Sequence, residues 1–210
     1  MKTINLHTGT HTRFTLFPDN QPHVTIMGVE AGEEVQVIAD LTNSVKLIQL
    51  LQVANAIGHA GAVKKQLLIP YLLGARYDRI MQPGDSFDLE VIAGMINSCG
   101  FLEVLLFDVH SDIAPSLIQH ATAISNKSMV QAYKEKNAVL ICPDNGAAKK
   151  TGQYRDWNSG ISDIVYCEKK RDLSTGKITL KVTEPEKCLG RSCVIIDDIC
   201  DGGATFLAIA

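Results

Sequence analysis

Two adjacent acids and a glycine-rich turn close to residue 200 form the pattern with the clearest chemical meaning. The run VIIDDICDGGAT, at 194–205, predicts an apolar strand that ends at Asp197 and Asp198 and leads through a turn into a helix. In open α/β sheets, ligands bind beyond the carboxyl ends of the strands. The pattern therefore predicts a ligand site at the end of this strand.

The residue types of this run fit a sugar phosphate. Gly202 and Gly203 allow a tight turn whose bare N–H groups can face a phosphate, and the start of the helix adds its positive dipole end. The Thr205 hydroxyl is a further donor, and the carboxylates of Asp197 and Asp198 can accept from the adjacent hydroxyls of a ribose. The alternative is a strand that ends in a solvated acidic turn, which would be the better interpretation of an isolated aspartate pair.

Arginines follow a second apolar run. In IPYLLGARYDR, at 69–79, Arg76 and Arg79 flank Asp78. A guanidinium binds phosphate or stacks on a nucleobase, and the carboxylate can hold an arginine or an amino group. The segment therefore predicts an anion-binding or base-binding site.

Two further runs end in polar residues that could serve a metal ion or a phosphate. FDVHSD, at 107–112, carries His110 beside acids, and ICPDNGAAK, at 141–149, carries Asp144. Taken alone, a histidine with nearby acids is more often a satisfied structural pair. At the end of a strand it is a candidate for binding Mg²⁺ or phosphate, with Asp144 as a metal or substrate acceptor.

Short apolar runs must supply the strands that position these residues. The runs are continuous rather than alternating, which predicts strands covered on both faces. They fall at 35–39, 66–71, 103–109, 138–142, 162–167 and 192–197. Helical periods lie between them at 44–60 and at 87–98, the second with Asp85 or Ser86 as its N-cap. This alternation predicts an α/β protein with doubly wound parallel sheets.

Two similar domains of this design are expected, 1–130 and 131–210, with the boundary near 124–137. Residues 171–184 interrupt the alternation and predict a hairpin or a flexible flap. Residues 204–210 have the pattern of the first turns of a helix, so the second domain is expected to be cut short.

Composition and charge argue against several classes of function. The chain has 210 residues and a net charge of −3, so no broad basic surface for nucleic acid is expected. No apolar run approaches the roughly 20 residues that cross a bilayer, and the first residues lack the apolar core of a signal peptide. Six scattered cysteines without a C-x-x-C pair predict a reducing, cytoplasmic setting and no structural zinc.

Five motifs, in one order along almost the whole chain, resemble those of ribose-phosphate pyrophosphokinases. The matching segments are Ile69–Arg79, Asp108–His110, Cys142–Ala147, Lys169–Arg171 and Asp197–Thr205. Simple type I phosphoribosyltransferases resemble the chain in the last segment alone. The resemblance implies a fold of the type I phosphoribosyltransferase kind, with ATP on the side of the first domain and ribose 5-phosphate on the side of the second.

The resemblance also implies roles for individual residues. ATP would be bound by Phe17, Asp19, Gln21, Arg76, Tyr77 and Asp78. Mg²⁺ and phosphates would be served by Asp108, His110 and Asp144. The catalytic cations would be Lys169 and Arg171. Ribose 5-phosphate would be held by Asp197, Asp198, Asp201, Gly202, Gly203, Ala204 and Thr205.

The sequence departs from the family pattern at several positions. Gln21 replaces an acid of the adenine loop, Tyr77 stands where glutamine is common, and 80–86 replace a basic stretch over ATP. Adenine recognition and the family's regulatory phosphate sites are therefore expected to differ.

The reaction that the resemblance implies belongs to nucleotide biosynthesis. It moves the β,γ-diphosphate of ATP to the 1-hydroxyl of ribose 5-phosphate and gives phosphoribosyl pyrophosphate and AMP. In the family, the loop that 17–21 resembles reaches the site of a neighbouring subunit, which implies a homo-oligomer, typically a hexamer built from dimers. Two alternatives stay open: a phosphoribosyltransferase that consumes the same product, and a non-catalytic regulatory subunit associated with a synthetase.

Overall fold

The chain forms two compact units, Met1–Ser125 and Asn126–Ala210. The computed structural model describes residues 1–171 and 178–210, so the tip of the predicted hairpin lies outside the described residues. The sequence analysis divided the chain after residue 130, whereas the structural division falls after Ser125. Val130 is buried in the core of the second unit, which is why the preceding residues group with that unit.

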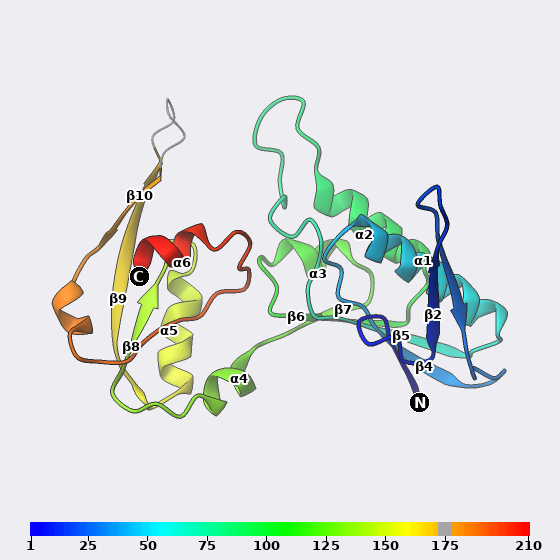
Figure 1. Ribbon diagram of the computed structural model, residues 1–210, viewed down its shortest axis with the longest axis horizontal. Coiled ribbons are helices and arrows are strands. Elements are labelled where there is room, and N and C mark those ends of the chain that lie inside the picture. The colour runs from blue at the N-terminus through cyan, green and yellow to red at the C-terminus, as the bar shows by residue number, and fades with distance from the viewer. Residues whose placement is uncertain (172–177) are drawn as a thin grey trace. The chain divides into compact units, whose positions relative to one another are not determined.

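The first unit is built on a parallel five-stranded sheet in the order β1-β4-β5-β6-β7 (Figure 1). Its strands are β1 (Lys2–Asn5), β4 (Glu34–Ile38), β5 (Lys64–Ile69), β6 (Glu103–Phe107) and β7 (Ala121–Ile124). The register pairs Val37 with Leu67 and Leu67 with Val104, and all three are buried in one core. The α/β class and the parallel sheet predicted from continuous apolar runs are thus confirmed.

Two helices bury one face each in the same core. Helix α1 (Ser44–His59) begins at Asn43, whose side chain accepts a hydrogen bond from the Lys46 amide, and helix α2 spans Asp88–Ser98. A short helix, α3 (Ile113–Leu117), follows β6. The N-cap predicted for α2 is wrong: the helix begins after Phe87 without a side-chain cap. The Asp85 carboxylate instead accepts a hydrogen bond from the Gln82 amide at 3.0 Å, within the loop that precedes the helix.

A β-hairpin absent from the sequence prediction lies against α1. Its strands are β2 (Thr12–Leu16) and β3 (Pro22–Ile26), which pair antiparallel. The Gln52 side chain on α1 donates to the Pro22 carbonyl at 2.6 Å. Residues 17–21 form the exposed turn, where the Phe17 amide donates to the Gln21 carbonyl at 3.0 Å and Asn20 adopts a φ of 66°.

The second unit carries a smaller, mixed sheet in the order β10-β9-β8-β11 (Figure 1). Its strands are β8 (Ala138–Cys142), β9 (Ile161–Arg171), β10 (Ile178–Val182) and β11 (Cys193–Ile195). Strands β9 and β11 flank β8 in parallel, whereas β10 runs antiparallel to β9, so the arms of the predicted hairpin are present. The helices are α4 (Lys127–Ala132), α5 (Ala148–Trp157), the 3-10 helix η1 (Pro185–Cys188) and α6 (Ala204–Ile209).

A buried asparagine joins the first two helices of this unit. The Asn158 amide group donates to the carbonyls of Val130 and Tyr133 at 2.6 and 2.9 Å, and its oxygen accepts from the Gly160 amide at 2.9 Å. Nearby, the Asn126 side chain donates to the buried Tyr154 hydroxyl at 3.1 Å. These bonds satisfy backbone groups at the ends of α4 and α5.

Replacing Asn158 by leucine is expected to lower the free energy of unfolding by about 2–4 kcal/mol, because the Val130 and Tyr133 carbonyls and the Gly160 amide lose their partner. Urea denaturation followed by the fluorescence of Trp157, the only tryptophan in the chain, measures this unit directly. The matched control is Gln153→Leu, an exposed position on α5, which should stay within about 0.5 kcal/mol of the parent. Equal stabilities for the two variants would contradict the assigned role.

Candidate functional site

In the first unit, a buried carboxylate gathers groups from the loops that follow β5 and β6. Asp78 is only 6% exposed, and both of its oxygens accept from the Arg79 guanidinium, at 2.7 and 3.1 Å. The hydrogen bond from Arg79 holds the pKa of Asp78 below its usual value, and Ser111 and His110 lower the pKa further. The two loops therefore meet at the carboxyl edge of the parallel sheet, where ligands of such sheets bind.

Residues around Asp78 leave much of this edge accessible. Arg76, Tyr77 and His110 are exposed, so a nucleotide could reach them. The Ser111 oxygen is buried and makes no hydrogen bond of normal geometry with the part of the chain that the structure describes, although its hydroxyl contributes to the low pKa of Asp78. Nothing in the sequence pattern singled out Ser111, and its contact with Asp78 is a tertiary one.

A glycine fixes the loop that carries Arg76 and Asp78. Gly74 has a φ of 76°, and a Cβ at this position would stand 2.6 Å from the Ile92 side chain. A left-handed backbone and the lack of space both favour glycine here. The loop therefore packs closely against α2 at Gly74.

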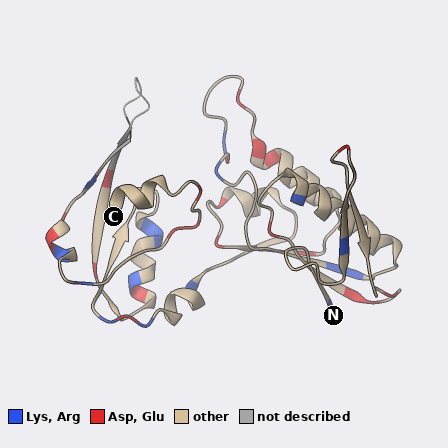
Figure 2. Ribbon diagram, in the orientation of Figure 1, with Lys and Arg blue, Asp and Glu red and all other residues tan. Residues whose placement is uncertain are grey.

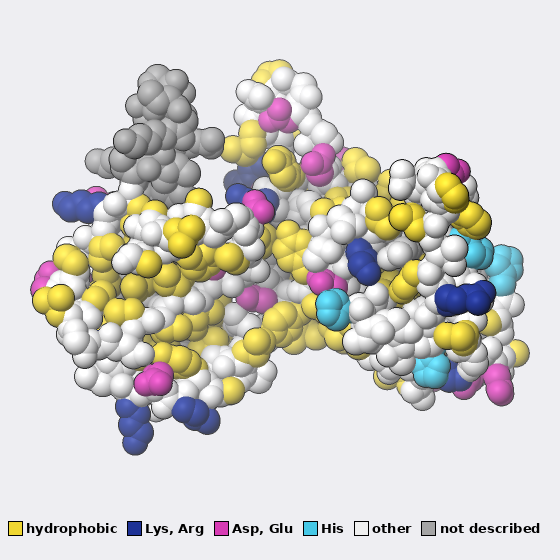
Figure 3. All heavy atoms as spheres, viewed as in Figure 1, with side chains coloured by type: hydrophobic (Ala, Val, Ile, Leu, Met, Phe, Trp, Pro, Cys, Tyr) yellow, Lys and Arg dark blue, Asp and Glu magenta, His cyan; other side chains and the backbone are white. Residues whose placement is uncertain are grey.

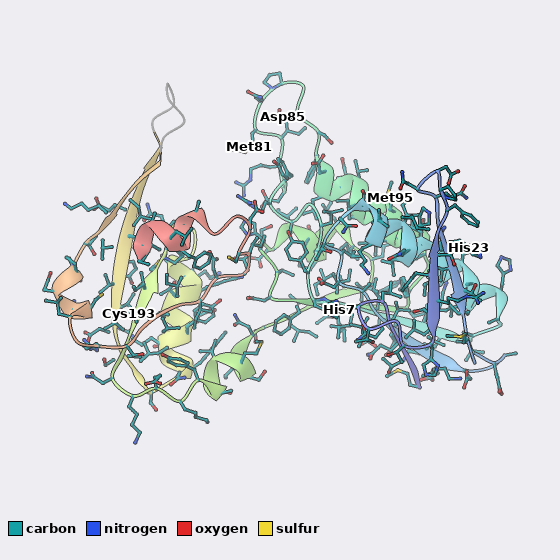
Figure 4. All side chains as sticks on the ribbon, in the orientation of Figure 1. His7, His23, Met81, Asp85, Met95 and Cys193 are labelled. Carbon is teal, nitrogen blue, oxygen red and sulfur yellow. The ribbon has the colours of Figure 1, made fainter. Side chains whose placement is uncertain are left out.

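The predicted adenine loop lies apart from that edge within the first unit. Phe17, Asp19 and Gln21 are exposed at the tip of the β2–β3 hairpin. Figure 4 labels His23 on this hairpin, and Met81 and Asp85, from the loop that follows Arg76–Asp78, on the other side of the unit. The Phe17 ring lies 6.3 Å from the His23 ring, so its described neighbour belongs to the hairpin itself. Within this chain the structure does not bring the two predicted ATP-binding segments together.

In the second unit, three carboxylates lie where parallel neighbours end. Asp144 follows β8, and Asp197 and Asp198 follow β11, whose residue Ile195 pairs with Ile141. The Asp197 carboxylate accepts a hydrogen bond from the Asp198 amide at 3.0 Å. The Asp144 carboxylate accepts one from the Ala147 amide, directly before α5, also at 3.0 Å. Figure 2 shows acidic residues along the stretch between β11 and α6. The structure thus brings Asp144, which the sequence analysis assigned to a metal ion or phosphate, close to Asp197 and Asp198, which it assigned to the ribose.

Negative charge at this edge is only partly compensated. Although Asp197 is exposed at the surface, partial burial of its carboxylate and the nearby Asp198 raise its pKa to about 6, and Asp144 adds to the rise. Lys150, in the first turn of α5, stands 3.8 Å from Asp198. The sequence analysis missed Lys150. Nothing in the sequence around this residue of α5 indicates that its side chain lies near Asp198. An excess of carboxylates in this arrangement suits hydroxyl donors or a divalent cation.

The turn after these acids has the predicted backbone form. Gly203 adopts a φ of 74° immediately before α6, a left-handed conformation that favours glycine. Asp201, Gly202 and Ala204 are exposed, and Thr205 is partly buried in the first turn of α6. The sequence reasoning that placed a glycine-dependent turn between the acids and a helix therefore matches the structure at Gly203.

The predicted catalytic cations lie on the β9–β10 hairpin. The backbones of Lys169 and Arg171 belong to β9, opposite Leu180 and Ile178 of β10. Their side chains lie outside the described residues, so their roles remain predictions from the resemblance.

The metal set predicted from the resemblance is divided between the two units. Asp108, which has a φ of 45°, and His110 belong to the first unit, and Asp144 belongs to the second. Among the described residues, no group of three or more His, Cys, Asp or Glu side chains is arranged to hold a metal ion. Figure 3 shows histidine side chains on the visible face of the first unit, where Figure 4 labels His7 and His23. Mg²⁺ keeps several waters and needs few protein ligands, so Asp144 beside Asp197 is compatible with it.

The raised pKa of Asp197 predicts how stability depends on pH. An unfolded aspartate titrates near pH 3.8, whereas folded Asp197 holds its proton up to about pH 6. Between these values the folded state binds more protons, so the contribution of this group to stability falls as the pH rises. Asp197→Asn should therefore gain stability relative to the parent as the pH rises from about 4 to 6. Urea titrations of both proteins at several pH values, read by Trp157 fluorescence, measure the difference; a difference independent of pH would contradict the assignment.

Comparisons with known proteins find similar sequences in one family. The model of the N-terminal domain of ribose phosphate pyrophosphokinase matches residues 2–100. The ribose-phosphate pyrophosphokinase of Saccharolobus solfataricus is 27% identical over 199 residues, which cover 91% of this chain and 67% of that protein. Ribose-phosphate pyrophosphokinase 2 of Archaeoglobus fulgidus is 31% identical over 201 residues, which cover 91% of this chain and 66% of that protein.

A solved structure has a similar fold. The crystal structure of phosphoribosylpyrophosphate synthetase from Mycobacterium smegmatis matches with a TM-score of 0.78 at 16% identity, over 94% of this chain and 66% of that one. The chain thus spans about two thirds of the length of the relatives it matches. In the part of the chain that the structure describes, no helix has the length and apolar character needed to cross a membrane.

Proposed function

Because the chain belongs to the ribose-phosphate pyrophosphokinase family, we propose that it transfers the β,γ-diphosphate of ATP to the 1-hydroxyl of ribose 5-phosphate. The products would be phosphoribosyl pyrophosphate and AMP. The observation that carries the proposal is the meeting of Asp144, Asp197 and Asp198 at the ends of β8 and β11, directly before the turn at Gly203. Carboxylates for a ribose diol next to a backbone turn for a phosphate are the two parts that ribose 5-phosphate requires.

The first unit supplies the proposed ATP side. Arg76 and Tyr77 are exposed at the carboxyl edge of the sheet, next to Asp78. Because Asp78 is already neutralised by Arg79, it would add little repulsion toward a polyphosphate. The Arg76 guanidinium could bind phosphate, and His110 could donate to a phosphate oxygen.

The proposed chemistry depends on position and charge. The 1-hydroxyl of ribose 5-phosphate attacks the β-phosphorus of ATP and loses its proton to water, while the bond from that phosphorus to the α,β-bridging oxygen breaks and AMP leaves. Such transfers rely on orientation and on stabilising the charge of the transition state. Asp197 and Asp198 would orient the ribose through its 2- and 3-hydroxyls, and Lys169 and Arg171 would stabilise the developing charge. Mg²⁺, when bound, would neutralise phosphate charge, and we propose Asp144, with Asp108 and His110 on the ATP side, as the residues that serve it.

A homo-oligomer is part of the proposal. The hairpin tip with Phe17 lies apart from the Arg76 loop within one chain, which supports a site that borrows the tip from a neighbouring subunit. We therefore propose dimers that assemble further, to a hexamer. Mixing the inactive variants Phe17→Ala and Lys169→Ala should restore activity, because some sites in the mixed assembly then receive intact residues from both subunits. Mixtures as inactive as the separate variants would contradict a shared site. We place the reaction in the cytoplasm, a reducing compartment that suits a chain with six free cysteines.

An assay of products tests the reaction directly. The protein is incubated with ATP, ribose 5-phosphate and MgCl₂, and nucleotides are separated by chromatography while ³¹P spectra follow the diphosphate. AMP and phosphoribosyl pyrophosphate should form in equal amounts, and only when ribose 5-phosphate is present. Release of ADP, or binding of both substrates without turnover, would refute the proposed reaction. Consumption of added phosphoribosyl pyrophosphate with a nucleobase would identify a phosphoribosyltransferase instead.

A further inference from the structure

Two cysteines outside the candidate site lie side by side in the second unit. Cys188 ends η1 and Cys193 begins β11. Between them the chain makes a turn in which the Arg191 amide donates to the Cys188 carbonyl at 3.2 Å and Gly190 has a φ of 69°. These values fit a type II turn with glycine at its third residue. The turn brings the Cys193 sulfur to 4.0 Å from the Cys188 carbonyl oxygen.

Accessibility distinguishes this pair from the other cysteines. Cys193 is exposed and Cys188 is partly buried, whereas Cys99, Cys142 and Cys167 are buried. Burial raises the pKa of Cys99 to about 11, which makes its thiolate scarce. Cys200 is also exposed, but it lies in the acidic turn beyond β11. Cys193 is therefore the thiol of the pair that a reagent in solution meets first.

A fixed arginine holds the loop between the two cysteines. The Arg191 guanidinium donates to Asp163 at 2.7 Å, to the Asn137 carbonyl at 3.1 Å and to the Lys187 carbonyl at 3.2 Å. These partners come from the starts of β8 and β9 and from η1, so the turn is tied to three elements. Burial and the neighbouring Cys193 raise the pKa of Cys188, and the charge of Arg191 opposes this rise. The loop is thus preorganised, and the second thiol stays close to the first.

We propose that Cys188 and Cys193 form a redox modification site that reacts with low-molecular-weight disulfides. The thiolate of Cys193 attacks one sulfur of the small disulfide, a mixed disulfide forms, and one small thiol leaves with the proton that Cys193 lost. The thiolate of Cys188 then attacks the Cys193 sulfur, the protein disulfide forms, and the second small thiol leaves. Two protein thiols are oxidised, one small disulfide is reduced to two thiols, and a dithiol reductant reverses the reaction.

The site stands apart from the acids of the proposed ribose site. Cys193 is at the amino end of β11, where Figure 4 labels it, and Asp197 lies beyond the carboxyl end of the same strand. The inference is independent of the proposed function, because it uses neither the carboxylates nor any substrate.

Peptide mapping tests the proposal with the intact chain. The protein is exposed to oxidised glutathione, free thiols are blocked with iodoacetamide, and trypsin is added. Trypsin cuts after Lys187 and after Arg191, so Cys188 and Cys193 fall on different peptides. We expect these two peptides to be disulfide-linked and the intact protein to lose about 2 Da, both reversed by dithiothreitol. The same linkage should form in Cys200→Ser, which removes the other cysteine of the second peptide.

Serine variants separate the two steps. Cys188→Ser should accumulate a lasting glutathione adduct on Cys193, because the resolving thiol is missing. Cys193→Ser should form neither the linked peptides nor that adduct. A parent protein that retains the adduct on Cys193 without forming linked peptides would overturn the proposal. Disappearance of the Cys193 adduct in Cys188→Ser would do the same, since it would assign the second step to another thiol.

Discussion

Replacement of Lys169 by alanine is expected to lower kcat for AMP formation by about 100- to 1,000-fold while changing KM for either substrate far less. The physical reason is that a cation placed on the transferring phosphoryl group interacts most strongly with the charge of the transition state, and only weakly with the bound substrates. Steady-state kinetics with ATP and with ribose 5-phosphate varied in turn measure both constants. A near-normal kcat would remove Lys169 from the mechanism.

The matched control for this variant is Lys181→Ala. Lys181 is an exposed cation on β10 of the same hairpin, opposite Glu168. Its removal changes the net charge by the same amount, so any general electrostatic effect on ATP appears in both variants. We expect kcat for Lys181→Ala to stay within about twofold of the parent, because a single exposed charge contributes little. A comparable loss in both variants would show that overall charge, and not the position of Lys169, controls the rate.

Replacement of Asp197 by asparagine is expected to weaken ribose 5-phosphate binding by about 10- to 100-fold, because one charged hydrogen bond to a hydroxyl is lost. KM for ribose 5-phosphate should rise by that factor, while KM for ATP should change little. The same variant should gain stability near neutral pH, since it removes the burial of a charged carboxylate and its repulsion by Asp198, which together raise the pKa of Asp197. A binding residue held against electrostatic repulsion would show this combination of lost affinity and gained stability.

The control for Asp197→Asn is Asp156→Asn, which removes a highly exposed aspartate at the end of α5. This control should leave KM for ribose 5-phosphate and the free energy of unfolding close to those of the parent. If Asp197→Asn binds ribose 5-phosphate as tightly as Asp156→Asn does, the sugar must be bound elsewhere. Isothermal titration with ribose 5-phosphate alone gives the affinity without turnover.

Much of the two sheets could be predicted from the sequence because their strands are continuous apolar runs. Strand β8 is buried along its whole length and was predicted with its observed bounds, 138–142. Such a run predicts its structure well, since a strand buries every side chain of a continuous apolar run only when both faces of the sheet are covered. Strand β11 is shorter than the predicted 192–197, because the chain leaves the sheet after Ile195, before the acids.

Elements without an apolar signature escaped the sequence analysis. The hairpin β2–β3 buries only Thr12 and Val24. Helix α5 carries lysines, a glycine and an arginine and buries only Thr151 and Tyr154. A helix with so narrow a buried face has weak periodicity. The N-cap predicted for α2 was wrong for a different reason. Asp85 and Ser86 are residue types that often cap helices, but whether they do so depends on the conformation of the preceding loop. Local patterns do not contain that information.

Residue types and order could identify members of the candidate site, but not all of their partners. Asp197, Asp198 and Asp144 were predicted because each follows an apolar run. Lys150 and Ser111 were missed, since each contacts its acid only after the sheet has formed. The predicted metal residues could not be grouped from the sequence, because which strand ends become neighbours depends on strand order.

The single tryptophan of the chain has a practical consequence for solution work. Trp157 belongs to the second unit, where its ring packs edge-on against Tyr154 at 5.8 Å. Its emission therefore reports the unfolding of the second unit and does not report the unfolding of the first. Far-ultraviolet circular dichroism averages both halves, so a gap between the two melting curves would measure how autonomously each half folds.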